Sequence, residues 1–169
     1  MDFLELMAEC SVALGGFAAI HAALRGSQGP RGSFRAWGTV SWAFTALLMA
    51  IVPPLIATGG KLDAGAWRLA HAIGLVPPVA SMATAMWIDL RLDAIGHVAQ
   101  VAVFLRTAQF LGISACLLLL SALAGWPLQA GPTTYSIAVT ALFVSGVVGI
   151  IASFWIAMRE SMAGEGDAG

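Results

Sequence analysis

Five long apolar stretches constrain this sequence more than any other feature. They cover residues 3–25, 36–57, 65–89, 97–124 and 134–158. Each holds about 20 residues or more, enough to cross a hydrocarbon core of about 30 Å. Lipid offers no partners for backbone N–H and C=O groups, so such segments fold as helices. The sequence therefore predicts an all-α fold, in which residues 1–169 form one polytopic transmembrane bundle of five helices.

The composition agrees with this class and excludes others. The chain is 59% hydrophobic and only 10% charged, whereas a soluble domain is about 25% charged. Its formal net charge is −1, which leaves no basic surface for nucleic acid. The expected partner is the lipid bilayer, together with the chain itself or another membrane protein.

The two ends of the chain have distinct expectations. Asp2, Glu5 and Glu9 lie in the first nine residues, with no Lys or Arg among them. A signal peptide begins with a basic region, so we expect the first stretch to be retained as a membrane helix. Residues 163–169 are small and acidic and are expected to form a flexible tail.

Positive charge predicts the orientation, because Lys and Arg favour cytoplasmic loops. The first loop, the third loop and the segment after the last stretch are basic, which places the N-terminus outside and the C-terminus in the cytoplasm. The residues that carry this pattern are Arg25, Arg31, Arg35, Arg91 and Arg159. Aromatic residues are expected near the inner boundary (Trp37, Trp87 and Trp155) and the outer one (Trp67, Trp126 and Tyr135).

The first stretch carries ionisable groups that are costly in lipid, and we expect it at the centre of the bundle. Counting turns from the outer helix ends places Glu5 level with Arg68, and Glu9 level with His71. Glu9 also shares a helix side with Gly16, which favours an inward position. We therefore expect an outer-leaflet cluster of Glu5, Glu9, Arg68 and His71. The cluster is either a structural clamp or a proton- or cation-responsive entry site, because a histidine titrates near neutral pH.

Other polar and irregular positions lie deeper. Arg106 and Gln109 share one helix face, where they serve as interhelical hydrogen-bonding groups or as residues on a pathway. Pro77 and Pro78 remove two backbone donors near mid-membrane and predict a helix break.

Small residues predict close helix packing. They recur every four positions in the last stretch, and a Gly pair lies in the first. Packing within one chain and a seam between copies both remain open. The residues are Gly15, Gly16, Ala141, Ser145, Gly149, Ser153 and Ala157.

The sequence predicts no catalytic residue, no metal site and no cofactor. Zinc-protease, nucleophile-elbow, Walker A and dinucleotide signatures are absent. Polar residues at the cytoplasmic helix ends are expected to be interface anchors: His21, Arg25, Asp89, Arg91, Asp93 and His97. The lesser alternatives are a metal-binding pair at Asp89 and Asp93 and haem ligation by His21 and His97. Cys10 and Cys116 are isolated and are expected to pack as small apolar side chains.

The first 55 residues carry a resemblance. Glu9, residues 14–18 (LGGFA), the basic first loop and the pair Pro53–Pro54 resemble a broad group of small uncharacterised bacterial inner-membrane proteins. This resemblance implies a multi-pass protein of the bacterial inner membrane and transfers no activity.

Three function classes follow from the sequence. A structural or accessory membrane subunit, acting by helix packing with itself or a partner, is the leading interpretation. A small oligomeric channel or transporter for protons or small ions is the alternative, and an enzyme or haem-binding subunit is the third.

Overall fold

The computed structural model describes residues 2–24, 29–57, 62–93 and 99–166. Within these ranges the chain forms five α-helices, α1 (Asp2–Leu24), α2 (Gly29–Ile56), α3 (Ala64–Asp93), α4 (Ala99–Ala124) and α5 (Pro132–Gly166). The expectation of an all-α fold is confirmed.

Three helices are longer than expected, and one of them is α3, which extends at its C-terminal end to Asp93. α2 begins at Gly29, so part of the expected first loop is helical. Pro30 suits this position, because the first turn of a helix needs no backbone donor. α5 continues to Gly166, through much of the expected flexible tail, and residues 167–169 lie outside the described part of the chain.

Local sequence explains where α3 begins and where α4 ends. The backbone N–H of Ala66 donates to Asp63 Oδ1 at 2.7 Å, which caps the start of α3. Gly125 has a φ of 73°, a conformation that favours glycine. The N–H of Trp126 donates to the Ser121 carbonyl at 3.2 Å, which closes a Schellman motif after α4.

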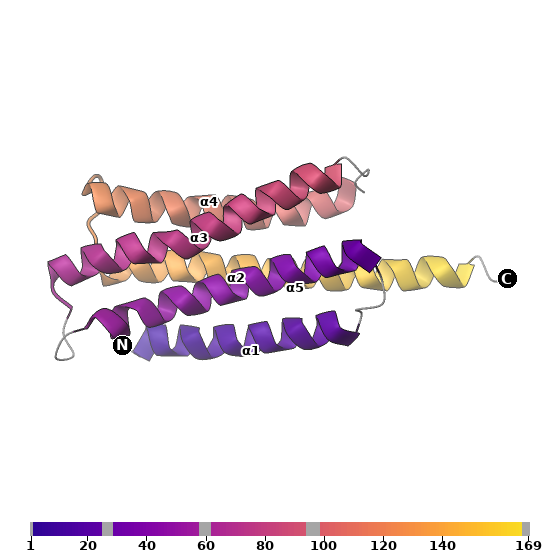
Figure 1. The fold of residues 1–169 in the computed structure, drawn as a ribbon, viewed down its shortest axis with the longest axis horizontal. Coiled ribbons are helices and arrows are strands. Elements are labelled where there is room, and N and C mark those ends of the chain that lie inside the picture. Colours follow the sequence, from indigo (N-terminus) through magenta and orange to yellow (C-terminus); the bar gives the residue numbers. More distant parts are fainter. Residues whose placement is uncertain (1, 25–28, 58–61, 94–98, 167–169) are drawn as a thin grey trace.

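The helices pack side by side, with α5 in contact with all four others (Figure 1). α1 packs on α2 and α5, whereas α4 packs on α5 and α3. Among the described residues, α1 contacts neither α3 nor α4. The expectation that the first helix lies at the centre is therefore wrong: α5 takes that place, and α1 lies at one edge.

Three helices of the described chain are long and apolar enough to cross a membrane, at Phe3–Ile20, Arg106–Ala124 and Pro132–Ala152. α2 offers a shorter apolar stretch, Val40–Ile56. α3 does not meet the same criterion in its described part, and Arg68, His71 and two prolines lower its hydropathy.

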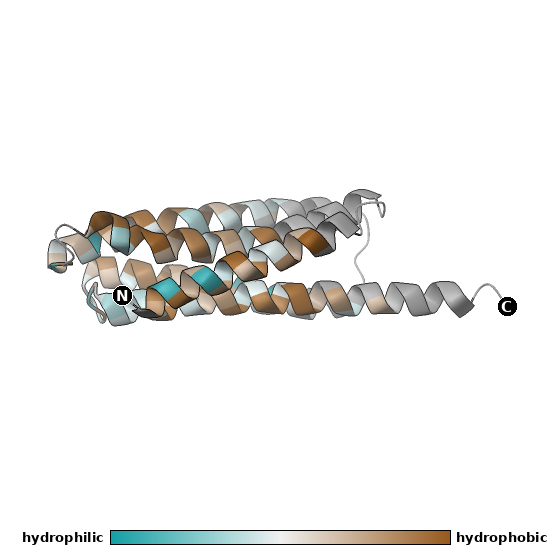
Figure 2. Ribbon diagram, turned by 90° about the horizontal axis from the view of Figure 1, so that it is seen from below, coloured by the Kyte–Doolittle hydropathy of each residue, from teal (hydrophilic) through white to brown (hydrophobic). Residues whose placement is uncertain are grey.

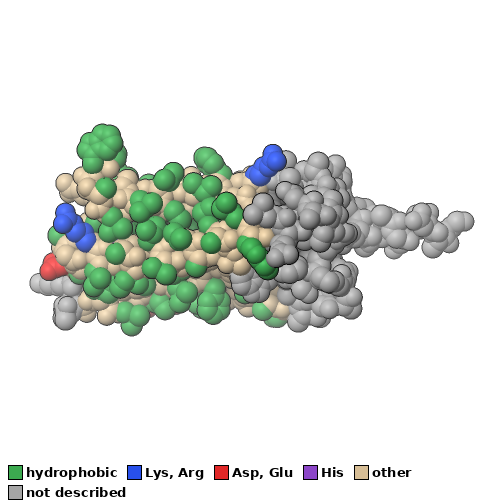
Figure 3. Space-filling model, turned by 45° about the horizontal axis from the view of Figure 1, so that its top comes forward, with side chains coloured by type: hydrophobic (Ala, Val, Ile, Leu, Met, Phe, Trp, Pro, Cys, Tyr) green, Lys and Arg blue, Asp and Glu red, His purple; other side chains and the backbone are tan. Residues whose placement is uncertain are grey.

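The outer surface matches a lipid environment. On the face in Figure 3, hydrophobic side chains cover the described part of the bundle and charged side chains lie toward its two ends. These observations support a membrane protein with a helical bundle fold.

Candidate functional site

The structure does not bring the four residues of the expected outer cluster together. Glu5, Glu9 and Arg68 are exposed, whereas His71 is fully buried. α1 and α3 do not touch, since both pack on α2. Within the described chain, no ion pair joins the four side chains.

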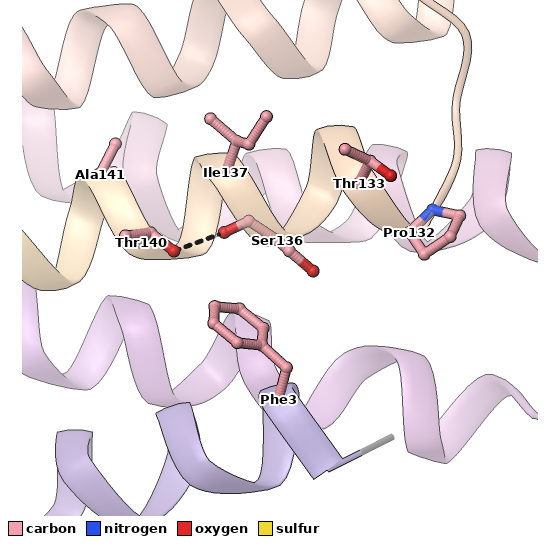
Figure 4. Close-up of a pocket in the computed structure, with 7 residues that line it drawn as sticks. All are labelled: Phe3, Pro132, Thr133, Ser136, Ile137, Thr140 and Ala141. Atoms are coloured by element: carbon pink, nitrogen blue, oxygen red, sulfur yellow. Dashed lines mark hydrogen bonds between the residues drawn. The ribbon is translucent and has the colours of Figure 1, made fainter.

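The depth of α1 against α5 explains part of this result. Phe3 points toward the first turns of α5 and lines a groove of about 580 Å³ with Pro132 and Ala141 (Figure 4). A Cβ at Gly146 would lie 3.3 Å from the Leu14 side chain. The two helices thus run in the same direction, and α1 begins deeper than α5. Phe3 is level with the first turns of α5, and Leu14 is level with Gly146. Glu9 lies between these two residues and is therefore level with about Leu142, the middle of the apolar stretch Pro132–Ala152.

Arg68 lies at a different depth. Its neighbours Trp67 and His71 place their rings 5.9 and 5.2 Å from the ring of Tyr135, in the first turn of α5. Arg68 is therefore level with the start of α5, about 15 Å above Glu9 at a rise of about 1.5 Å per residue. Counting from helix ends failed because the outer ends of α1 and α3 are not level, as Figure 1 also shows.

The exposed side of α1 is the first element of the candidate site. Glu9 and Gly16 do share a side, but that side faces away from the bundle. A Cβ at Gly16 would meet nothing within 4 Å, whereas one at Gly15 would lie 3.8 Å from Ala43. We call this side the α1 outer face. Its exposed residues are Glu5, Glu9, Val12, Gly16 and Ala19.

The α1 outer face combines carboxyl groups with an apolar helix. Figure 2, with α1 nearest the viewer, shows hydrophilic positions in its first half among largely hydrophobic ones. Only 17% of Phe3–Ile20 is buried, against 44% of Pro132–Ala152. α1 is thus the span with the most surface left for lipid or for another protein.

The second element is the buried ring cluster near the start of α5. His71 Nδ1 lies 2.8 Å from the carbonyl oxygen of Trp67, so Nδ1 carries the proton that is donated. His71 Nε2 is buried without a hydrogen-bond partner. The ring packs edge-on against Tyr135. His71 is therefore enclosed by aromatic groups, away from the carboxyl groups with which it was expected to pair.

Tyr135 was expected at the outer aromatic boundary, yet it is fully buried. Its hydroxyl donates to the backbone oxygen of Met49 at 2.8 Å. Met49 is four residues before Pro53, which has no N–H to complete the helical hydrogen bond. Tyr135 thus satisfies a carbonyl that proline leaves without its donor. A proline within a helix leaves the carbonyl four residues before it without a donor. Pro53 was therefore the sequence signal that could have pointed to this role of Tyr135.

The expected helix break at Pro77–Pro78 is not present as an interruption. α3 remains helical through both prolines, as α2 does through Pro53 and Pro54. Close to the α3 prolines, hydroxyl groups link the two helices. Ser41 Oγ donates to Ser81 Oγ at 3.1 Å, and the oxygens of Ser81 and Thr45 lie 2.6 Å apart. Sequence reasoning missed this hydroxyl cluster, although Ser41 and Thr45 are one turn apart.

The small residues of α5 pack mainly within the chain. Ser145 is buried, and its hydroxyl donates to the backbone oxygen of Ala108 on α4 at 2.9 Å. Gly149 is half-buried, and the side chain of Ser153 lies outside the described residues. Packing within one bundle therefore accounts for Ser145.

The polar pair of α4 divides between two environments. Arg106 is exposed, whereas Gln109 is half-buried and has an interaction partner. The contact of Ser145 with Ala108 places Arg106 level with about Val147. Arg106 is thus an exposed cation at the first residue of the α4 apolar stretch Arg106–Ala124, on the outside of the bundle.

The described residues contain no group of three or more His, Cys, Asp or Glu that could hold a metal ion. Cys116 is buried and Cys10 half-buried, and both are free thiols. The cytoplasmic residues considered as anchors or ligands have side chains outside the described part: His21, Arg25, Asp89, Arg91, Asp93 and His97.

Comparison with known proteins adds no assignment. No family model matches the chain, and no similar curated protein or solved structure was found.

Proposed function

We propose that this protein is a multi-pass protein of the bacterial inner membrane that acts by assembling with a membrane-embedded protein through the α1 outer face. This is a structural or accessory role. The observation that carries the proposal is the exposed carboxyl group of Glu9, level with the middle of the α5 span.

Lipid is a poor environment for that group. Insertion scales assign about 2.5–3.5 kcal/mol to an Asp, Lys or Arg at the centre of a membrane helix. A protein surface that brings a hydrogen-bond donor or a cation to the same depth removes most of this cost. Gly16 and Ala19 add small residues that allow a second helix to approach closely.

The proposed orientation places the N-terminus outside and the C-terminus in the cytoplasm, as the arginine distribution indicates. Gln129, exposed in the α4–α5 connection, then lies outside. A single cysteine at Gln129, in a chain without Cys10 and Cys116, should react with an impermeant maleimide in intact cells. Labelling only after permeabilisation would reverse the orientation.

In-membrane photo-crosslinking tests the assembly. A photoreactive amino acid replaces Val12 on the α1 outer face, and a matched variant carries it at Val79 on α3. These side chains are 58% and 49% exposed. We expect protein adducts from Val12 and mainly lipid adducts from Val79. Mainly lipid adducts from Val12 would refute the proposal.

An oligomeric channel or transporter for protons or small ions is the second candidate. The observation that favours it is the location of Glu9 and Arg106 on outer faces of the bundle, so that a polar path would run between copies. Proteoliposomes with a pH-sensitive dye test this function. Flux that Glu9→Gln alters would support it, and no flux above empty liposomes would exclude it.

A further inference from the structure

We infer that the partner of the α1 outer face is a second copy of this chain, in which Arg106 of α4 pairs with Glu9 of the first copy. This inference rests on the proposed function and names its partner. Glu9 and Arg106 are oppositely charged and exposed, and among the described residues neither has an ionic or hydrogen-bonding partner.

The two side chains lie at compatible depths. Glu9 is level with about Leu142 and Arg106 with about Val147, a difference of about 7 Å at 1.5 Å per residue. Helical ion pairs four residues apart already bridge about 5–6 Å between Cβ atoms, and arginine has a long stem. Copies inserted in one orientation share these depths, so the pairing needs no shift along the membrane normal.

The position of the helices allows the contact. In the described part of the chain α1 and α4 do not touch, and each packs against α5. Figure 1 shows them at opposite edges of the bundle. Contact of α1 in one copy with α4 in the next is heterologous, and in a plane such contacts build closed rings.

The exposed stripes of the two helices share one spacing and carry opposite charges. Along α4 the exposed side chains recur at alternating steps of four and three, as in a helix-pairing seam. The α1 outer face shows the same spacing with smaller residues toward its C-terminal half. The α4 residues are Arg106, Phe110, Ile113, Leu117 and Leu120. α4 runs opposite to α5, so Phe110 and Ile113 are level with the first half of α1, where Leu6 and Val12 are exposed.

Charge reversal tests the pairing. Glu9→Lys places a cation opposite Arg106 of the next copy, and Arg106→Glu places a carboxylate opposite Glu9. Each variant alone should reduce crosslinked oligomer about tenfold or more, because like charges face each other. Coexpression lets the two variants alternate, which restores opposite charges at each interface between unlike copies and should recover most of the oligomer.

A control and a disulfide pair complete the experiment. Arg68→Glu reverses an exposed charge about 15 Å away in depth and should leave the oligomer unchanged. In a chain without Cys10 and Cys116, Leu6→Cys, beside the α1 outer face, and Ile113→Cys, on the α4 stripe, lie at similar depth and should crosslink between copies. Leu6→Cys with Leu48→Cys, exposed on α2, is the matched negative control.

The outcomes separate the inference from the proposed function. Full oligomer in either charge-reversal variant, or no recovery on coexpression, overturns the Glu9–Arg106 pairing. If Val12 crosslinks to a different protein and Leu6 and Ile113 form no intermolecular disulfide, the second-copy inference fails while the proposed function stands. If Val12 forms only lipid adducts, both the second-copy inference and the proposed function are refuted.

Discussion

The hydrogen bond from Tyr135 to Met49 makes a quantitative prediction. Tyr135→Phe keeps the buried ring but removes the hydroxyl that lies 2.8 Å from the Met49 carbonyl oxygen. Hydrogen bonds between membrane helices contribute about 0.6 kcal/mol on average and up to about 1.7. Pro53 leaves this carbonyl without its helical donor, so we expect a loss near the upper end, about 1.5 kcal/mol.

The proline itself supplies the control. Pro53→Ala restores an N–H that can donate to Met49, so the hydroxyl of Tyr135 matters less in that background. There, Tyr135→Phe should lower the free energy of unfolding by less than about 0.5 kcal/mol, a coupling of about 1 kcal/mol.

The four proteins to compare are the wild type, Tyr135→Phe, Pro53→Ala and the double variant. Their unfolding is measured in mixed micelles with increasing sodium dodecyl sulfate and followed by circular dichroism. The midpoint should move for Tyr135→Phe and move little for the same change after Pro53→Ala. An equal loss in both backgrounds would show that the hydroxyl does not replace the donor that proline lacks.

Three further substitutions probe the interior by the same unfolding assay, with Gly16→Ala as an exposed control. Gly74→Ala should destabilise by about 1–3 kcal/mol, because its Cβ would lie 2.7 Å from the Tyr135 hydroxyl, while Gly16→Ala, with nothing within 4 Å, should be neutral in detergent. Ser81→Ala should lower the free energy of unfolding by about 1 kcal/mol, because its hydrogen bonds to Ser41 and Thr45 are lost. An unchanged midpoint would show that the hydroxyl cluster does not stabilise the fold. His71→Phe loses the hydrogen bond from Nδ1 to the Trp67 carbonyl but also removes the unpartnered Nε2, so stability should stay within about 1 kcal/mol. A loss of several kcal/mol would reveal a partner at Nε2.

The sequence predicted the helices well because the lipid environment imposes a simple rule. Apolar length identified all five. The errors at Gly29 and Gly166 concern segments rich in Gly and charge, where hydropathy ends before the helix does. Hydropathy reports burial in lipid and not the local hydrogen bonding that ends a helix.

The candidate site was harder to predict, since it depends on how helices are placed relative to one another. Periodicity correctly put Glu9 and Gly16 on one side of α1, but periodicity does not say whether that side faces inward. The depth of Glu9 was wrong relative to Arg68 because the connections do not reveal where each helix begins along the membrane normal. Tyr135 looked like a boundary residue from its position, and only the carbonyl left free by Pro53 explains its burial.

Assembly through Glu9 and Arg106 is the central claim, and a count of copies in the membrane tests it most directly. Stepwise photobleaching of a fluorescent label, in vesicles prepared from dilute expression without detergent, gives that count. We expect more than one bleaching step per assembly for the wild-type protein and a single step for Glu9→Lys. Single-step bleaching of the wild-type protein, or wild-type counts for Glu9→Lys, would contradict the account.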